Sequence, residues 1–339
     1  MTSPFRLFSL PHVPLKQVLN NVEPEALLIL SMCSRRSKSI AVSFRGPSKH
    51  VRLSLNFGLG DRLEGSDKRD VLLVVKKNLP MDHNTMETVR IGSFEKVPVR
   101  MEFLYQEEGE QCLITYWEDG ITGLTAIGDY VREVFNRDIS EMMIGEKQDE
   151  DDHRRAAEWV KNSQGTIQIL HCDFKPKIDN DLDLILENFN CTERLSLYVK
   201  PSEHYSPARM PNFKVDSLNI LFSFWIKQDH LLTMNCKYIV LQYSKLTNQD
   251  FNAFVKHWIA GGCSQLKKLW VTVEEPIDYG VVLDGVEFTE RARDVERVFV
   301  DERRTSHIIT GGFDVKRSNV TATVVDIGQQ SQLFFMIVW

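Results

Sequence analysis

The first forty residues carry apolar side chains at helical spacings, separated by short breaks. Apolar positions in residues 10–22 recur every three or four residues, which predicts a short amphipathic helix. Pro24 fits the first turn of a second helix, and Glu23 and Glu25 suit its positive end. That helix is apolar on more than one side. A third helix is predicted to begin near Ser34.

These three short helices cannot bury all their leucines among themselves. So much apolar helical surface in so few residues favours a binding surface for another protein. The helices can equally pack onto the rest of the chain, and the pattern alone leaves both interpretations open.

From residue 49 the hydrophobic period changes to two, which is typical of strands. Strands are predicted at 51–55, 71–75, 89–91 and 97–101, with turns at the glycine-rich segments 58–60 and 65–67. Residues 127–139 predict a helix with one apolar face. The acidic tract at 146–152 predicts a solvated loop, and we place a domain boundary at 148/149.

Residues 151–275 alternate predicted helices and strands in a weak internal repeat. The helices are at 152–162, 181–189 and 248–259, and the strands are at 167–172, 195–200, 239–246 and 266–273. A single strand–helix unit cannot bury its apolar face, so neighbouring units stack into a curved sheet. The pattern predicts a leucine-rich-repeat-like stack, with an ordinary mixed α/β sheet as the alternative. The apolar run 333–339 predicts a terminal strand.

Charge and motifs exclude several classes of function. The net charge of -6 argues against a general nucleic-acid binder. No apolar run approaches the length of a membrane helix, and the first thirty residues do not resemble a signal peptide. The six cysteines have no zinc-ligand spacing, and we expect them to be reduced and buried. We therefore expect a cytoplasmic or nuclear protein.

No catalytic or cofactor motif is present. The sequence has no phosphate-binding loop, no nucleophile elbow and no metalloprotease signature. The run His171-Cys172-Asp173 has metal-binding atoms, but adjacent strand residues point to opposite faces and seldom bind one ion. We predict no enzyme activity, no cofactor and no metal, and an active site built from distant residues is the minor alternative.

Residues 8–35 resemble an F-box. The segment has a Leu10-Pro11 opener, an apolar helix, a proline-led helix rich in leucine, and a Cys33-Ser34-Arg35 element, in the order and at the distances of that family. The resemblance implies that the segment docks a Skp-family adaptor. By this resemblance, eight residues face the adaptor or hold the helical unit together: Leu10, Pro11, Val18, Leu19, Pro24, Leu27, Leu30 and Cys33.

A second resemblance lies in residues 235–269, which are similar to the type-2 F-box-associated domain of a family expanded in nematodes. Its core is the motif Asn-x-Phe-x-Lys-His-Trp-x-x-Gly, which begins at Asn252 and ends at Gly261. The segment 312–317 with Ala322-Thr323 also resembles the closing part of that family. There Ser318-Asn319 replaces the Asp-Gly that usually follows the basic residue.

Together the resemblances imply a substrate-recognition subunit of a cullin–RING (SCF-type) ubiquitin ligase. It would bind a Skp-family adaptor, and through it a cullin scaffold, while its C-terminal domain holds an unknown target protein. The alternative is a stand-alone repeat-type scaffold with a degenerate F-box. The default target surface is the exposed residues of strands 167–172, 195–200 and 239–244.

The fold class expected is therefore α+β with α/β character. We expect an N-terminal three-helix F-box at 1–48, a mixed β-rich region at 49–148 and a leucine-rich-repeat-like domain at 149–339.

Overall fold

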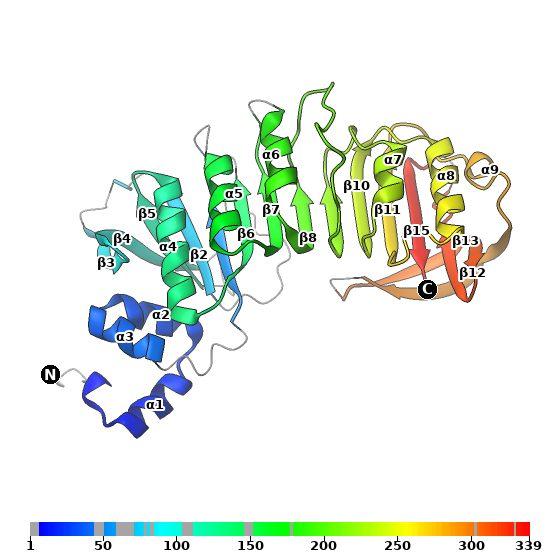
Figure 1. Ribbon diagram of the computed structural model, residues 1–339. Helices are drawn as coiled ribbons and strands as arrows, with labels where there is room; N and C mark the ends of the chain where they lie inside the picture. Colours follow the sequence, from blue (N-terminus) through cyan, green and yellow to red (C-terminus); the bar gives the residue numbers. More distant parts are fainter. Residues whose placement is uncertain are drawn as a thin grey trace. The chain divides into compact units, whose positions relative to one another are not determined.

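The computed structural model describes residues 7–43, 51–58, 71–77, 80–81, 85–103, 111–145, 152–176, 179–301, 304–328 and 330–339. The chain forms two compact units, Met1–Ile167 and Gln168–Trp339 (Figure 1). The predicted boundaries at 48/49 and 148/149, the turns around 59–60 and 65–67, and the acidic residues 146–151 lie outside the described residues.

The first unit begins with the predicted helices. A short 3-10 turn, η1 (Leu7–Ser9), precedes α1 (His12–Asn20), α2 (Pro24–Met32) and α3 (Arg35–Ser43). Pro24 occupies the first turn of α2, where its missing N–H costs nothing. The Ser34 hydroxyl accepts a hydrogen bond from the Ser37 N–H at 3.0 Å and so caps α3. The prediction of three helices is confirmed.

The remainder of the first unit is a mixed sheet with strand order β6-β1-β2-β5-β4-β3. Strands β6, β1, β2 and β5 run parallel, and β4 and β3 complete the sheet as an antiparallel hairpin. The helix α4 (Gly120–Phe135) packs against β1, β2 and β5, and α5 (Asp152–Ser163) packs against α4. The strands are β1 (Leu53–Phe57), β2 (Val71–Lys77), β3 (Glu87–Ile91), β4 (Phe94–Phe103), β5 (Gln111–Trp117) and β6 (Ile139–Gly145).

The helix predicted at 127–139 was placed too late in the chain. It begins at Gly120, where the Asp119 carboxylate accepts a hydrogen bond from the Thr122 N–H at 3.2 Å, and it ends before Asn136. Asn136 has a φ of 52°, the left-handed conformation that commonly ends a helix. Ile139 instead opens β6. Strands β5 and β6 were missed, because the apolar run in β5 has no period of two and Ser140 and Glu141 interrupt the apolar pattern of β6.

The second unit is built on parallel strands. Its strand order is β12-β13-β14-β15-β11-β10-β9-β8-β7, and β8, β9, β10 and β11 run parallel. The helices α6 (Asn180–Asn188), α7 (Gln228–Thr233) and α8 (Asn248–Ile259) lie along one face of these strands (Figure 1). The parallel strands are β7 (Ile167–Asp173), β8 (Cys191–Leu197), β9 (Ser217–Ile220), β10 (Tyr238–Ser244) and β11 (Lys268–Val273).

An antiparallel group closes the second unit. The terminal strand β15 (Leu333–Val338) was predicted as a strand, and it pairs with β11 on one side and β14 on the other, so it is not an edge. The elements of the second unit that were not predicted are β9, α7, α9 (Tyr279–Val282), β12 (Phe288–Val300), β13 (Ser306–Arg317) and β14 (Val320–Val324). Strand β12 is rich in Arg, Asp and Glu and therefore lacks the apolar pattern of a strand. The expected α+β class, with a strand–helix stack, is confirmed.

Candidate protein interface

Helix α2 has two apolar faces with different surroundings. One face is buried in the first unit and consists of Leu27, Leu28, Ser31 and Met32. The opposite stripe follows the spacing i, i+3, i+4, i+7 and consists of Ala26, Ile29, Leu30 and Cys33. Ile29 is 39% exposed although it lies on a helix that is otherwise apolar. An apolar stripe that the chain itself leaves uncovered is typical of a protein interface.

Helix α1 repeats this division. Leu15 and Leu19 are buried, whereas Val18 is 39% and Val13 66% exposed. Pro11 and Pro14 are also exposed. We call the apolar residues of this uncovered surface the F-face: Pro11, Val13, Pro14 and Val18 at α1, and Ala26, Ile29, the half-buried Leu30 and Cys33 at α2.

The eight residues expected from the resemblance fall into three groups. Leu19 and Leu27 are buried and hold the helical unit together. Leu10, Pro24 and Leu30 are half-buried, and Pro11, Val18 and Cys33 are exposed. Sequence reasoning missed Val13 and Ile29, although Ile29 stands three residues from Ala26 and four from Cys33. Cys33 also differs from the expectation that all cysteines are buried, because it ends α2 at the surface.

The buried side of α2 and α3 is fastened to α4. The Ser31 hydroxyl shares a 3.1 Å hydrogen bond with the phenol of Tyr130, and the Lys38 ammonium lies 2.6 Å from the Glu133 carboxylate and 4.6 Å from the Tyr130 ring centre. Burial and the Glu133 charge raise the pKa of Tyr130, which therefore stays neutral. One face of the helices thus packs onto the rest of the first unit, as the second interpretation expected, and the other face stays uncovered by the described residues.

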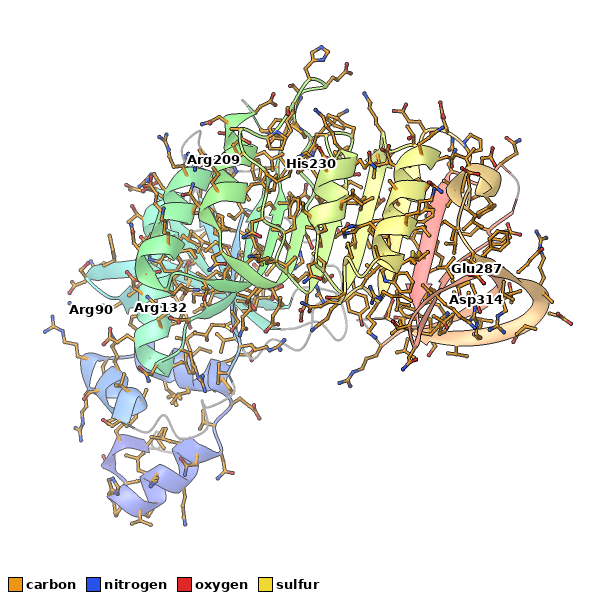
Figure 2. All side chains as sticks on the ribbon, turned by 45° about the vertical axis from the view of Figure 1, so that its right-hand side comes forward. Arg90, Arg132, Arg209, His230, Glu287 and Asp314 are labelled. Atoms are coloured by element: carbon orange, nitrogen blue, oxygen red, sulfur yellow. The ribbon has the colours of Figure 1, made fainter. Side chains whose placement is uncertain are left out.

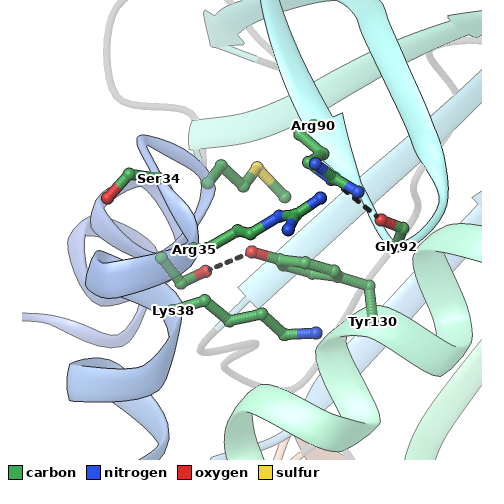
Figure 3. Close-up of a pocket in the computed structure, with 8 residues that line it drawn as sticks. Ser34, Arg35, Lys38, Arg90, Gly92 and Tyr130 are labelled. Atoms are coloured by element: carbon green, nitrogen blue, oxygen red, sulfur yellow. Dashed lines mark hydrogen bonds between the residues drawn. The ribbon is translucent and has the colours of Figure 1, made fainter.

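Beside these contacts, a hollow of about 170 Å³ lies between α2 and α3 on one side and β3 and α4 on the other (Figure 3). Ser34, Arg35 and Lys38 line it on one side and Arg90 and Tyr130 on the other. Lys38 and Arg90 already have carboxylate partners, Glu133 and Glu95 respectively. Arg35 has no carboxylate partner among the described residues, so it is the unbalanced charge of the hollow.

In the second unit, the motif that ends at Gly261 is structural. Its Asn252 donates hydrogen bonds from its side-chain amide to the carbonyls of Val282 and Asp284, both at 2.9 Å. Phe254 and Trp258 are fully buried. The Arg317 guanidinium lies 4.5 Å from the centre of the Trp258 ring and donates to the Trp258 and Gly262 carbonyls, and so closes the end of α8.

Asp314 is the centre of a buried polar network at the end of the second unit (Figure 2). Arg291 and Arg297 donate to its two carboxylate oxygens at 2.6 and 3.0 Å, and Thr323 donates to it at 2.6 Å. Trp339 donates to the Thr323 hydroxyl at 2.8 Å. Burial raises the pKa of Asp314, but these hydrogen bonds and the Arg297 charge outweigh it and lower the pKa overall.

No catalytic arrangement emerges in the part of the chain that the structure describes. There, no three His, Cys, Asp or Glu side chains are placed to hold a metal ion. Burial raises the thiol pKa of Cys191 and Cys236 to about 12 and that of Cys263 to about 11, so none is a thiolate nucleophile at neutral pH. Among the described residues, every helix is too short or too polar to span a bilayer.

Family models match two segments of this chain. Residues 7–48 match the F-box domain, and residues 209–271 match the F-box-associated domain of the second type. The first segment carries the F-face, and the second contains the motif that packs α8. The chain therefore has an F-box followed by an F-box-associated domain, an arrangement that indicates an interaction protein rather than an enzyme.

Two nematode proteins are similar over most of the chain. The Skn-1 dependent zygotic transcript 15 protein of Caenorhabditis elegans is 25% identical over 313 residues, which cover 84% of each chain. An uncharacterized protein of the same organism is 19% identical over 343 residues, which cover 99% of this chain and 79% of the relative. No solved structure matches the chain significantly.

Proposed function

We propose that this protein is a substrate-recognition subunit of a cullin–RING (SCF-type) ubiquitin ligase. The F-face binds a Skp-family adaptor, which connects the chain to a cullin scaffold, and the second unit holds a target protein. The F-box and the F-box-associated domain, in this order, support the proposal. Such a subunit makes and breaks no bonds. It raises the effective concentration of a target lysine near a ubiquitin-loaded enzyme.

The observation that carries the proposal is the division of α2 between two faces. Leu27, Leu28 and Met32 pack inside the first unit and hold the helix there. Ile29 and Leu30 on the opposite stripe remain available to a partner. A stand-alone scaffold with a degenerate F-box does not require an uncovered apolar stripe on α2.

The test is co-purification of the full chain with a Skp-family adaptor. The variants are Val18→Glu and Ile29→Glu, because burying an unpaired carboxylate in an interface costs several kcal/mol. Both residues are exposed, so each variant keeps its fold. Leu19→Glu is a poor choice, since a charge at this buried position unfolds the F-box itself. Val298→Glu, an exposed valine on β12, is the matched control.

The proposal predicts a stoichiometric complex for the wild type and for Val298→Glu, and loss of that complex in Val18→Glu and Ile29→Glu. Circular dichroism verifies that each variant is folded. An adaptor complex that survives both F-face changes would place the interface elsewhere. Folded wild-type protein that forms no complex would leave only the scaffold alternative.

A further inference from the structure

The carboxyl ends of β8, β9 and β10 carry an exposed group of aromatic and basic side chains. Because these strands are parallel, their ends meet at one rim of the sheet. Phe222 follows β9, and its ring stacks on Tyr243 at 5.7 Å between ring centres with an interplanar angle of 16°. Lys200 follows β8 and places its ammonium 5.6 Å from the Phe222 ring centre. The rim of parallel strands is a common ligand-binding position in α/β sheets.

Tyr243 is held there at a cost to the fold. Its φ is 50°, a left-handed conformation that a bulky side chain rarely adopts, and the register of β10 on β11 shifts at this point. The Tyr243 N–H donates to the Thr272 hydroxyl at 3.1 Å, which fixes the strained backbone. Yet the side chain is 64% exposed and contributes little burial in return. Backbone strain that is not compensated by burial of the side chain is typical of functional sites.

Two fully buried serines form hydrogen bonds next to this aromatic pair. The N–H and hydroxyl of Ser223 both donate to the Gln242 carbonyl, at 2.9 and 2.8 Å. The hydroxyl of Ser244 accepts from the Leu246 N–H at 3.2 Å. These bonds flank Phe222 and Tyr243 on both strands. The aromatic pair is therefore pre-organised, so little conformational entropy is lost when a ligand binds.

Lys200 and Lys245 bring two ammonium groups to this rim. Lys245, at the end of β10, lies 5.8 Å from the ring centre of Phe224, as Lys200 does over Phe222. Neither lysine forms an ion pair with any residue that the structure describes, and both are exposed. Acidic residues lie close to this part of the chain as well: Glu203 follows Lys200, the Asp179 carboxylate accepts from the Ser202 N–H at 2.8 Å, and Glu274 and Glu275 follow β11. The positive part of the rim is therefore confined to the two ammonium groups.

We propose that Lys200, Phe222, Tyr243 and Lys245 bind an acidic segment of the target protein, in which carboxylates flank an aromatic side chain or a proline. The ring of that residue stacks on the Tyr243 face, and the carboxylates pair with the two ammonium groups. The assignment rests on the proposed role of the second unit in holding a target. Lys200 and Tyr243 lie within two of the strand segments that were the default target surface.

The test is fluorescence anisotropy with short labelled peptides and the full chain, measured with and without a Skp-family adaptor. Each peptide has a central phenylalanine and proline, flanked by glutamates, lysines or serines. We expect the glutamate peptide to bind best, and to bind more weakly as salt rises. The double variant Lys200→Glu/Lys245→Glu weakens it about tenfold or more, whereas Lys214→Glu/Lys267→Glu, at the amino ends of β9 and β11, leaves affinity unchanged.

Tyr243→Gly separates binding from folding. Glycine accepts the left-handed conformation without strain, so the variant should unfold at the same temperature as the wild type or higher and still lose the peptide. Equal affinity for all three peptides, or equal affinity in the two double variants, would overturn the assignment. Adaptor binding is measured on the same samples. If adaptor binding is absent while peptide binding is intact, the ligase role is refuted but the peptide site is not.

Discussion

Asp314 shows how one carboxylate joins three strands. It lies on β13, and its partners Arg291 and Arg297 come from β12 and Thr323 from β14. A buried carboxylate without partners would be costly, but here each oxygen accepts a charge-assisted hydrogen bond. The network compensates for the charged, weakly apolar sequence of β12.

We therefore predict that Asp314→Asn destabilises the second unit by about 1–3 kcal/mol, because the buried carboxylate loses its charge toward the partly exposed Arg291 and Arg297. Asp326→Asn is the control: its partner Arg293 is largely exposed, and we expect a loss below about 1 kcal/mol. Urea unfolding at neutral pH measures both. Equal stability of the two variants would contradict the role given to the network.

The pH dependence of this contribution has a definite sign. The pKa of folded Asp314 lies below its ordinary value of 3.8, so the stabilisation is fully present above that pH. It is lost as the pH falls through the lowered pKa. The stability difference between the wild type and Asp314→Asn should accordingly shrink on acidification.

At the scale of elements, the sequence predicted what is local and missed what depends on distant partners. The bounds of α8 were predicted correctly at 248–259, and the structure shows that Thr247 and Asp250 form a capping box at its start. Strand β12 could not be recognised, because its pairing with β13 and the Asp314 network stabilise it rather than its own pattern. Nor could the sequence tell which apolar face of α2 is buried, because both are equally apolar.

The last turn of α8 is closed by Arg317. We expect Arg317→Gln to lower the stability of the second unit by about 1–2 kcal/mol, since the last turn loses two carbonyl contacts and the stacking on Trp258. Lys316→Gln, the exposed neighbour, should change little. Thermal unfolding of both variants measures this difference in stability. An unchanged unfolding temperature in Arg317→Gln would show that the end of α8 does not need the Arg317 contacts.

At the level of the whole molecule, our proposals assign the two binding tasks to different units of the chain. The first unit carries the F-face on one side of α1 and α2, and the second carries the rim formed by Lys200, Tyr243 and their neighbours. Sequence motifs predicted the two domains, because both motifs are compact stretches of chain. They did not predict the rim, because Lys200, Phe222 and Tyr243 come together only when β8, β9 and β10 pair.

The reactivity of Cys33 tests directly whether the adaptor binds the F-face. Cys33 lies in the F-face and is exposed, whereas the other five cysteines are buried. The measurement is the rate at which a maleimide labels Cys33, followed by mass spectrometry, with and without a Skp-family adaptor. We predict rapid labelling of the free chain and strong protection in the complex. Equally rapid labelling in a verified complex would show that the adaptor does not cover this face.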